Sequence, residues 1–161
     1  MSLSDTLRLG MRRLASGVCV VTTEADGVRY AMTASSVTSL SDEPASLLVC
    51  VNKVAAMQPY LTKGQPIAVN ILSSDQQLVS NKCAEKEAGE ERFSVGTWLT
   101  DEKTNLPYLS DAQATFFCSV DNDNYEYGTH QIVVGRLIDA VVPEIEVDPL
   151  IYLNGNYQEI K

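Results

Sequence analysis

The sequence predicts a mainly β (α+β) fold, a small antiparallel barrel with a few flanking helices. Six short segments are rich in β-branched residues, as strands are; they span residues 18–23, 28–36, 46–51, 67–72, 113–121 and 130–142. Helical patterns do not alternate regularly with these segments, whereas a sheet built from βαβ units requires such alternation. The chain also contains neither G-x-G-x-x-G nor G-x-x-x-x-G-K, the nucleotide-binding fingerprints of parallel sheets.

The length and composition of the chain fit one domain with its own core. It has 161 residues, of which 45% are hydrophobic. No internal repeat, low-complexity stretch or linker interrupts the sequence. We therefore expect residues 1–161 to form a single domain.

A short helix is predicted at the beginning of the chain. Ser4 or Asp5 can cap its N-terminus, and Gly17 is a stop signal after it. Its apolar residues recur at i, i+4 and i+7, which indicates one apolar face; they are Leu7, Met11 and Leu14.

Two helical stretches and a loop are predicted between the strands. Residues 54–63 read as a helix that Pro59 weakens, and residues 75–88 contain good helix formers with Asp75 as a cap. Residues 89–112 are typical of a loop.

The charge of the chain limits the partners that it can bind. The formal net charge is −9, which argues against nucleic acid and against an anionic membrane surface. The N-terminus lacks a basic region followed by an apolar stretch, and no run approaches the roughly 20 apolar residues of a membrane span. We therefore expect a cytoplasmic protein without a membrane or nucleic-acid partner. A phosphorylated small ligand remains compatible, because it responds to local donors more than to total charge.

The four cysteines do not form a metal or redox motif. No two of them lie in a C-x-x-C spacing, so a zinc ribbon or a thioredoxin motif is excluded. Cys19, Cys50 and Cys118 lie in apolar runs and are expected in the core. Cys83 lies among polar residues, and it is the one cysteine expected to contact a ligand.

Residues 31–38 form an unusual segment of small and hydroxyl-bearing side chains. Larger aliphatic residues would bury more surface in a core strand, whereas small ones leave room for a flat molecule against the backbone. Their hydroxyls and amides can hydrogen-bond a polyanionic tail. The alternative interpretation is an ordinary Ser/Thr-rich strand with one solvated face.

Two further segments combine strand patterns with polar groups. The apolar segment 49–53 ends in Asn52 and Lys53, an amide and a compact cation that suit a phosphate; alternatively, Lys53 only ends a strand in water. The segment 127–136 carries His130, the only histidine. One histidine without spaced carboxylates does not build a metal site. No G-x-S-x-G motif supports a nucleophilic centre at His130.

Taken together, these segments resemble the short-chain flavin reductases, which include the reductase components of two-component flavin monooxygenases. The characteristic pieces are M-T-A-S-S at 32–36, V-C-V-N-K at 49–53 and G-T-H at 128–130. The resemblance covers nearly the whole chain, in order: residues 11–23, 31–41, 43–44, 48–53, 68–72, Gln76, Leu109, 111–112, 128–136, 149–152 and 155–157. It implies an FMN-binding split β-barrel with antiparallel, Greek-key-like connections.

The resemblance also implies the residues of a flavin site. The flavin ring and ribityl chain would lie along Thr33, Ala34, Ser35 and Ser36. The flavin tail and phosphate would be reached by Asn52 and Lys53. The phosphate side would be completed by a turn containing Ser80, Lys82, Cys83 and Ala84. His130 would face the nicotinamide or the flavin ring, and Tyr157 would close the same side. Family members often carry an aromatic residue at the position of Cys83 and an arginine near Lys82, so this wall departs from the family pattern.

The implied activity is NAD(P)H-dependent reduction of FMN, with FAD as an alternative flavin. The cofactors carry the redox chemistry, so the absence of an acid–base pair is compatible with a reductase. The resemblance further implies a homodimer that releases reduced flavin to an oxygenase component. The sequence leaves open the choice between NADH and NADPH and the identity of the oxygenase.

Two other functions remain as alternatives at this stage. A non-catalytic FMN-binding or electron-carrier protein could use the same fold and the same residues. A hydrolase could use Ser35 or Cys83 together with His130.

Overall fold

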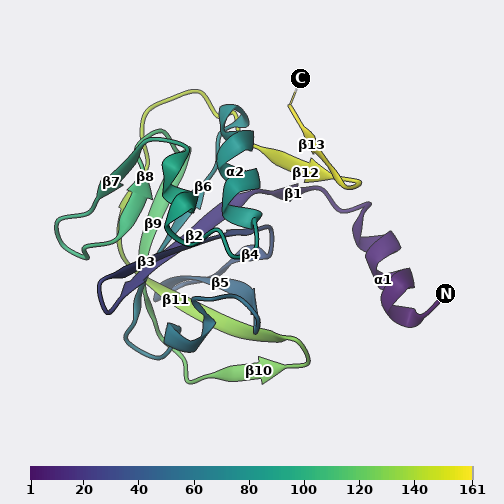
Figure 1. The fold of residues 1–161 in the computed structure, drawn as a ribbon, viewed down its shortest axis with the longest axis horizontal. Coiled ribbons are helices and arrows are strands. Elements are labelled where there is room, and N and C mark those ends of the chain that lie inside the picture. Colours follow the sequence, from purple (N-terminus) through teal and green to yellow (C-terminus); the bar gives the residue numbers. More distant parts are fainter. Residues whose placement is uncertain (161) are drawn as a thin grey trace.

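One antiparallel sheet forms the body of the molecule and curves into an open barrel (Figure 1). The computed structural model describes residues 1–160. Seven strands follow the order β3–β2–β6–β9–β11–β5–β4, and β10 pairs with β11 beside this path. This architecture confirms the mainly β fold class. The strands are β2 Cys19–Ala25, β3 Val28–Ala34, β4 Val37–Asp42, β5 Ala45–Asn52, β6 Pro66–Ile71, β9 Ala114–Val120, β10 Tyr125–Tyr127 and β11 His130–Val141.

The two edges of this sheet are consecutive strands of the chain. β3 and β4 lie at opposite ends of the strand order, yet only Ser35 and Ser36 separate them in sequence. The barrel is therefore split between β3 and β4, and a two-residue link crosses the split. The predicted strand 28–36 was wrong at its C-terminal end, because the chain bends at Ser35 to leave one edge for the other.

Branched aliphatic side chains fill the interior of the barrel. They are almost fully buried: Val21, Val49, Val51, Ile67, Val69, Val120 and Val133. Burial of one such side chain contributes about 1.5–3 kcal/mol. At Gly135 on β11, an added Cβ atom would lie 3.0 Å from the Cβ of Cys118. A larger residue at this position would therefore crowd the packing between β11 and β9.

A second core lies outside the barrel, beneath α2 (Gln77–Ala84). This helix packs against β3 and β2, and its Val79 and Cys83 join Val18, Val20 and Ala31 in one buried cluster. The short elements around it are the 3₁₀ turn η3 Gly89–Ser94 and the hairpin of β7 Trp98–Thr100 with β8 Pro107–Leu109. Because β2 lies between the two cores, its residues 19–23 are all buried.

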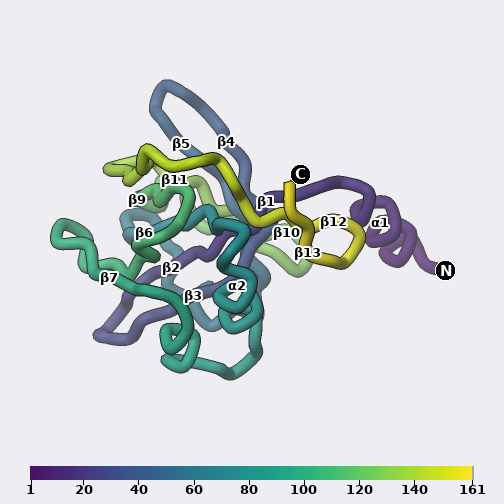
Figure 2. The backbone as a smooth tube through the Cα atoms, turned by 90° about the horizontal axis from the view of Figure 1, so that it is seen from above, coloured from purple at the N-terminus to yellow at the C-terminus, as the bar shows by residue number. Residues whose placement is uncertain are grey.

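A small sheet connects the two ends of the chain. β12 Ile151–Leu153 pairs with both β13 Asn156–Gln158 and β1 Ser16–Gly17. The first helix, α1 Leu3–Met11, begins beyond this sheet and stands apart from the barrel in two perpendicular views (Figures 1 and 2). No helix within residues 1–160 is both long and apolar enough to cross a membrane.

Helix α1 confirms the predicted element but corrects its details. Ser2 caps it, rather than Ser4 or Asp5, and Asp5 completes a capping box by bonding back to the backbone of Ser2. The predicted apolar face is not covered within the described chain, because none of the residues of α1 is buried.

The other helical predictions hold in part. Residues 54–63 form only a 3₁₀ turn, η1 Gln58–Tyr60, since Pro59 lies at its start. The helix predicted over 75–88 is shorter: a 3₁₀ turn, η2 Ser74–Gln76, leads into α2, and Ser73 caps η2 in place of Asp75. The predicted loop 89–112 contains η3 and the hairpin of β7 and β8.

Candidate functional site

The link between β3 and β4 is an exposed seat of small side chains. Ser35 and Ser36 are both exposed. The Ser36 hydroxyl donates to the Cys50 carbonyl oxygen at 2.9 Å, and the Cys50 N–H donates to the Ser36 carbonyl oxygen at 3.3 Å. These bonds hold the link against β5. Two of the three predicted segments therefore meet here, on the open side of the barrel.

On one side of the link, β3, α2 and β13 meet in a hydrogen-bonded group that we call the helix cluster: Thr33, Ser80, Asn81 and Tyr157. The Thr33 hydroxyl donates to the Ser80 carbonyl oxygen at 2.6 Å. The Tyr157 hydroxyl lies 2.7 Å from the Ser80 hydroxyl and donates to Asn81 Oδ1 at 3.1 Å. Because the phenol proton points to Asn81, the Ser80 hydroxyl donates to the phenol oxygen. Ser80 is fully buried, so the cluster is fixed in place.

On the other side of the link, β5, β10 and β11 meet in a group that we call the strand cluster: Asn52, Lys53, Glu126 and His130. His130 stands opposite Asn52 in the pairing of β11 with β5. The Lys53 N–H donates to the Thr129 carbonyl oxygen at 3.0 Å, and Lys53 Nζ lies 3.2 Å from Glu126 Oε2. The third predicted segment therefore lies next to the second, as the sequence indicated.

The polar groups of the strand cluster remain open to a ligand. Asn52 Oδ1 accepts a bond from the Val54 N–H at 3.1 Å, which leaves the amide NH₂ group of Asn52 as a donor. Hydrogen bonds from Asn124 and then from Lys53 lower the pKa of Glu126 below its ordinary value. Glu126 is therefore ionised at neutral pH and neutralises part of the Lys53 charge.

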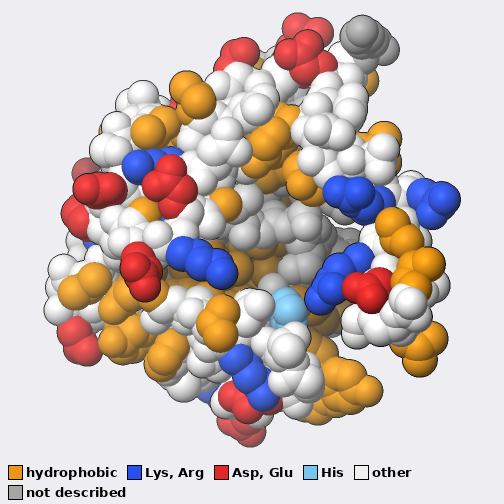
Figure 3. All heavy atoms as spheres, turned by 45° about the vertical axis from the view of Figure 1, so that its right-hand side comes forward, with side chains coloured by type: hydrophobic (Ala, Val, Ile, Leu, Met, Phe, Trp, Pro, Cys, Tyr) orange, Lys and Arg blue, Asp and Glu red, His pale blue; other side chains and the backbone are white. Residues whose placement is uncertain are grey.

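The ring of His130 is exposed at the end of β11. Its Nδ1 lies 2.8 Å from the Thr129 hydroxyl, which leaves Nε2 as the nitrogen that can face a ligand. Figure 3 shows this histidine, the only one in the chain, at the rim of a hollow. Lysine and arginine side chains border the hollow on several sides, although the chain as a whole is acidic. The hollow is thus locally favourable for an anion.

Lys82 adds a second cation on the α2 side. Its Nζ lies 3.1 Å from Glu85 and 3.8 Å from Glu91, and 24% of its side chain is exposed. The carboxylate side chains of Glu85 and Glu91 are 53% and 77% exposed, so water screens both pairs and an incoming phosphate can compete with them. Ala84, the last residue of α2, is exposed beside it.

Three of the predicted binding side chains are buried instead: Ser80, which bonds within the helix cluster, Cys83 and Ala34. The Cys83 side chain is only 2% exposed and packs in the cluster beneath α2, where burial raises the pKa of its thiol to about 12. Ala34 is 7% exposed and belongs to the barrel core. Ala34 can offer a ligand only its backbone. Cys83 is neither a contact at the surface nor a thiolate nucleophile, because its sulfur faces the interior and keeps its proton.

Sequence reasoning missed three residues of the site. Asn81 and Glu126 were missed as members of the two clusters, and Thr129 was missed as the partner of the His130 ring. Asn81 and Thr129 are next in sequence to the predicted site residues Ser80 and His130, so this proximity could have pointed to them. Glu126 had no such signal, because its contact depends on the pairing of β10 with β11.

The arrangement suits a flat molecule with an anionic tail. Small exposed side chains form the seat, the Asn52 amide and the Ser35 hydroxyl can donate, and two lysines lie on opposite sides. No group of three or more His, Cys, Asp or Glu side chains that could hold a metal ion occurs within residues 1–160. These residues fit FMN: the seat would hold its ring, and the positive charges of the two lysines would attract its phosphate.

Known proteins are similar to this chain in both sequence and fold. Residues 11–161 match the family described as flavin reductase like domain. The FMN reductase (NADH) RutF of Variovorax paradoxus strain S110 is 35% identical over 153 residues, which cover 95% of this chain and 83% of the relative.

Two solved structures extend the comparison. BorF, the flavin reductase component of a bacterial two-component tryptophan halogenase, is 33% identical with a TM-score of 0.86, and the match covers 98% of each chain. The NADH:FAD oxidoreductase SgcE6 of Streptomyces globisporus C-1027, solved with NAD and FAD fragments, is 29% identical with a TM-score of 0.88 over 99% of this chain and 93% of that one. This chain belongs to the flavin reductase-like domain family.

Proposed function

We propose that this protein is an NADH-dependent FMN reductase that supplies reduced flavin to a separate monooxygenase. One observation carries the proposal: the family match runs over residues 11–161, and it includes the exposed link at Ser35 and Ser36 with a cluster of donors on each side. We propose NADH rather than NADPH as the electron donor, because the RutF relative is an FMN reductase that uses NADH. FMN is preferred to FAD for the same reason, although SgcE6 uses FAD.

Each part of the site has a role in this proposal. The link provides a seat for the flavin ring, and Thr33 borders it on the α2 side. Lys82 and Lys53 attract the flavin phosphate, while the Asn52 amide donates to the flavin tail. His130 orients the nicotinamide through its free Nε2. Ser80 and Tyr157 hold Thr33 and α2 in place, so they act as positioning residues.

The chemistry demands orientation rather than proton transfer from a side chain. NADH and FMN supply the redox chemistry themselves, hydride passing from the nicotinamide to the flavin ring. The protein must hold the two rings within roughly 3–3.5 Å of each other and exclude water between them. Backbone N–H groups beside the seat can stabilise negative charge on the flavin ring without a general base.

We also propose that the protein is a cytoplasmic homodimer, as expected from the sequence. Reduced flavin must leave the site to reach an oxygenase, so an open and partly exposed pocket is suitable. The half-exposed side chains of the strand cluster are consistent with moderate affinity.

The test is anaerobic mixing of the purified protein with NADH and free FMN, followed by the loss of oxidised-flavin absorbance. We expect catalytic bleaching, faster with NADH than with NADPH and faster with FMN than with FAD. If no bleaching exceeds the buffer control, the reductase proposal is wrong. If the protein binds FMN in the same experiment but shows no turnover, a flavin carrier replaces it.

A further inference from the structure

Strand β10 ends in an exposed tyrosine beside the candidate site. Tyr127 is 78% exposed, although its strand is hydrogen-bonded to β11. Among the described residues, it belongs to none of the buried clusters of the fold. The core therefore does not use this aromatic ring, whereas a flat ligand could cover it and gain its contact area.

The strand register places this ring in line with the site. Tyr127 stands opposite His130 in the pairing of β10 with β11, and His130 stands opposite Asn52 in the pairing of β11 with β5. Directly opposite residues of antiparallel strands point to the same face of the sheet, with Cβ atoms roughly 5 Å apart. We call these three residues the strand-end row. The row spans roughly 10 Å across three neighbouring strands.

A tight turn holds Tyr127 in this row. Only Gly128 and Thr129 connect β10 to β11, and Gly128 has a φ of 57° while the φ of Thr129 is not positive. Two-residue hairpin turns with glycine in the first place pair the residues on either side of them. The Lys53 N–H donates to the Thr129 carbonyl oxygen at 3.0 Å, which ties the turn to the end of β5. The backbone therefore fixes the position of Tyr127 next to His130.

The order of the strands determines which part of a nucleotide can reach Tyr127. β11 lies between β5 and β10, and the link at Ser35 and Ser36 contacts β5 on the side away from β11 (Figure 1). With the flavin on the link and the nicotinamide at His130, the nicotinamide lies between the flavin and Tyr127. The other half of NADH is an adenosine phosphate, and its adenine is a flat aromatic base.

We propose that Tyr127 stacks on the adenine of NADH and is thereby a binding residue for the electron donor. This inference rests on the proposed reductase function and extends it to the second half of the dinucleotide. Stacking of a base on an aromatic side chain needs no hydrogen bond, so one exposed ring at a strand end is sufficient. Because Tyr127 and His130 are neighbours in the strand-end row, the dinucleotide binds in a bent conformation with its two bases close together.

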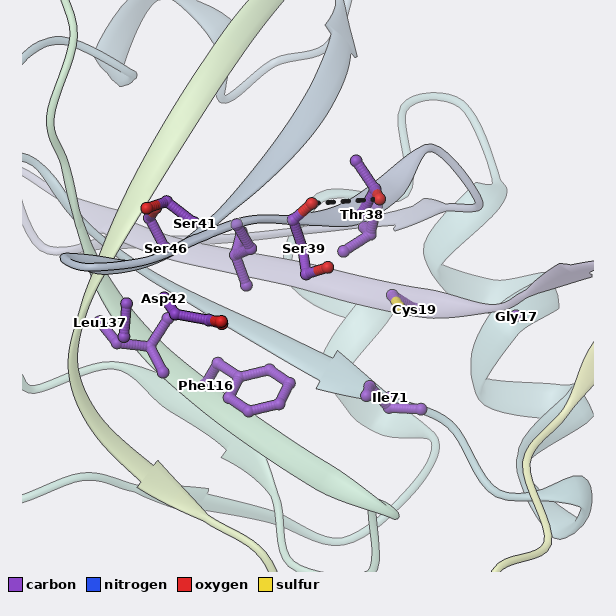
Figure 4. A pocket seen from close by; sticks show the side chains of 13 residues that line it. Gly17, Cys19, Thr38, Ser39, Ser41, Asp42, Ser46, Ile71, Phe116 and Leu137 are labelled. Carbon is purple, nitrogen blue, oxygen red and sulfur yellow. Dashed lines mark hydrogen bonds between the residues drawn. The ribbon is translucent and has the colours of Figure 1, made fainter.

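An apolar groove elsewhere on the barrel does not offer the adenine another place. It lies between the hairpin of β4 with β5 and the strands β2, β6, β9 and β11, and its volume is about 400 Å³ (Figure 4). Leu47 lines this groove, and no residue of the strand-end row does. Leu47 and Asn52 are five residues apart on β5, so their side chains point to opposite faces of the sheet. The groove therefore opens away from Tyr127.

Two electron donors that differ only in the adenosine half test the proposal. Reduced nicotinamide mononucleotide carries the nicotinamide without the adenine. In Tyr127→Ala, the KM for NADH should rise about tenfold, whereas the KM for reduced nicotinamide mononucleotide should change by less than about twofold. The kcat at saturating NADH and the Kd for FMN should stay within about twofold, because the lost contact affects only donor binding. Tyr127→Phe, which keeps the ring, should retain the KM for NADH of the natural chain.

A matched control and a binding assay without turnover complete the experiment. Tyr125 is 56% exposed on the same strand, but it pairs with Ile132 and lies outside the strand-end row. Tyr125→Ala should therefore change the KM for NADH by less than about twofold. ADP-ribose contains the adenine and no nicotinamide. Its Kd, measured by NMR titration, should rise about tenfold in Tyr127→Ala and stay within about twofold in Tyr125→Ala.

The outcomes separate this inference from the proposed activity. The absence of turnover with both donors would overturn the reductase function, and the ADP-ribose titration would still decide whether Tyr127 contacts an adenine. The stacking proposal is wrong if folded Tyr127→Ala loses both donors equally or loses neither. It is also wrong if Tyr127→Phe is as impaired as Tyr127→Ala, or if Tyr125→Ala shows the same loss. Circular dichroism should show that all variants are folded.

Discussion

The helix cluster is anchored on one fully buried residue, whereas the strand cluster is open to solvent. In the helix cluster, Ser80 is fully buried and joins β3 to β13 through Thr33 and Tyr157. In the strand cluster, His130 is exposed, and 37% of the Lys53 side chain is exposed in its pair with Glu126. The two clusters flank the same link, so one site combines a hydrogen-bonded, partly buried wall with a solvent-exposed one.

This difference indicates how the two sides contribute to binding. Side chains that are already fixed lose little entropy when a ligand arrives, so the helix cluster can hold the flavin in one orientation. The open strand cluster can let both the flavin tail and the nicotinamide enter and leave. The following substitutions test this division of roles.

The largest effect is expected from reversing both cations of the site. Lys53→Glu/Lys82→Glu should raise the KM for FMN on the order of 100-fold, because both charges that attract the phosphate are reversed. Riboflavin, which lacks the phosphate, should change by less than about threefold, because its binding uses the seat alone. Steady-state kinetics with both flavins measure this. Lys103→Glu, at an exposed ion pair with Asp139, is the control; equal losses for FMN and riboflavin would contradict phosphate recognition.

A smaller and more selective effect is expected at His130. His130→Ala should lower kcat/KM for NADH about tenfold while the Kd for FMN changes by less than about twofold, since the ring is proposed to orient only the nicotinamide. His130→Asn, which keeps a polar side chain, should recover part of the loss. Kinetics and flavin titration measure the two quantities, and an equal loss of FMN affinity would place His130 on the flavin instead.

At the helix cluster, Tyr157→Phe removes the hydroxyl that Ser80 and Asn81 share. The free energy of unfolding should fall by about 1–1.5 kcal/mol, because Ser80 is then a buried donor without its partner. Urea denaturation measures this. Tyr152→Phe is the matched control, because Tyr152 packs on Tyr157 with ring centres 5.3 Å apart and is 40% exposed. The free energy of unfolding of this control variant should change little. Equal losses in the two variants would mean that the hydroxyl bonds do not fix the cluster.

The smallest effect is expected in the titration of Glu126. Its pKa is lowered below 4.5 by Asn124 first and by Lys53 second, so its ion pair is complete above pH 4.5 and is lost as the pH falls through the lowered pKa. In Lys53→Met the pKa should rise only part of the way to its ordinary value, since the bond from Asn124 remains. Carboxyl chemical shifts followed by NMR report this value; an unchanged pKa would show that Lys53 does not contact Glu126 in solution.

The strand ends of the site could be read from the sequence, whereas several side-chain directions could not. Small residues at 33–36, three of them with hydroxyls, an amide and a cation at the end of β5, and a histidine opening β11 are local patterns, and the structure brings them together. Cys83 illustrates the limit: its neighbours in sequence are polar, yet it turns inward because α2 packs that side on the second core. The sequence shows which residues are neighbours along the chain, whereas burial depends on residues from other segments that pack against the side chain.

By itself, the sequence determined the antiparallel barrel, the polar strand ends and an amphipathic first helix, because alternation and periodicity are encoded within a few residues. Only the tertiary structure decided where the barrel splits, that Ser35 and Ser36 bridge the split, and that Glu126 meets Lys53. These features depend on strand order and register, which bring together residues far apart in the chain. For the same reason, the pattern of α1 predicts an apolar face but not what covers it, and within residues 1–160 no residue of α1 is buried.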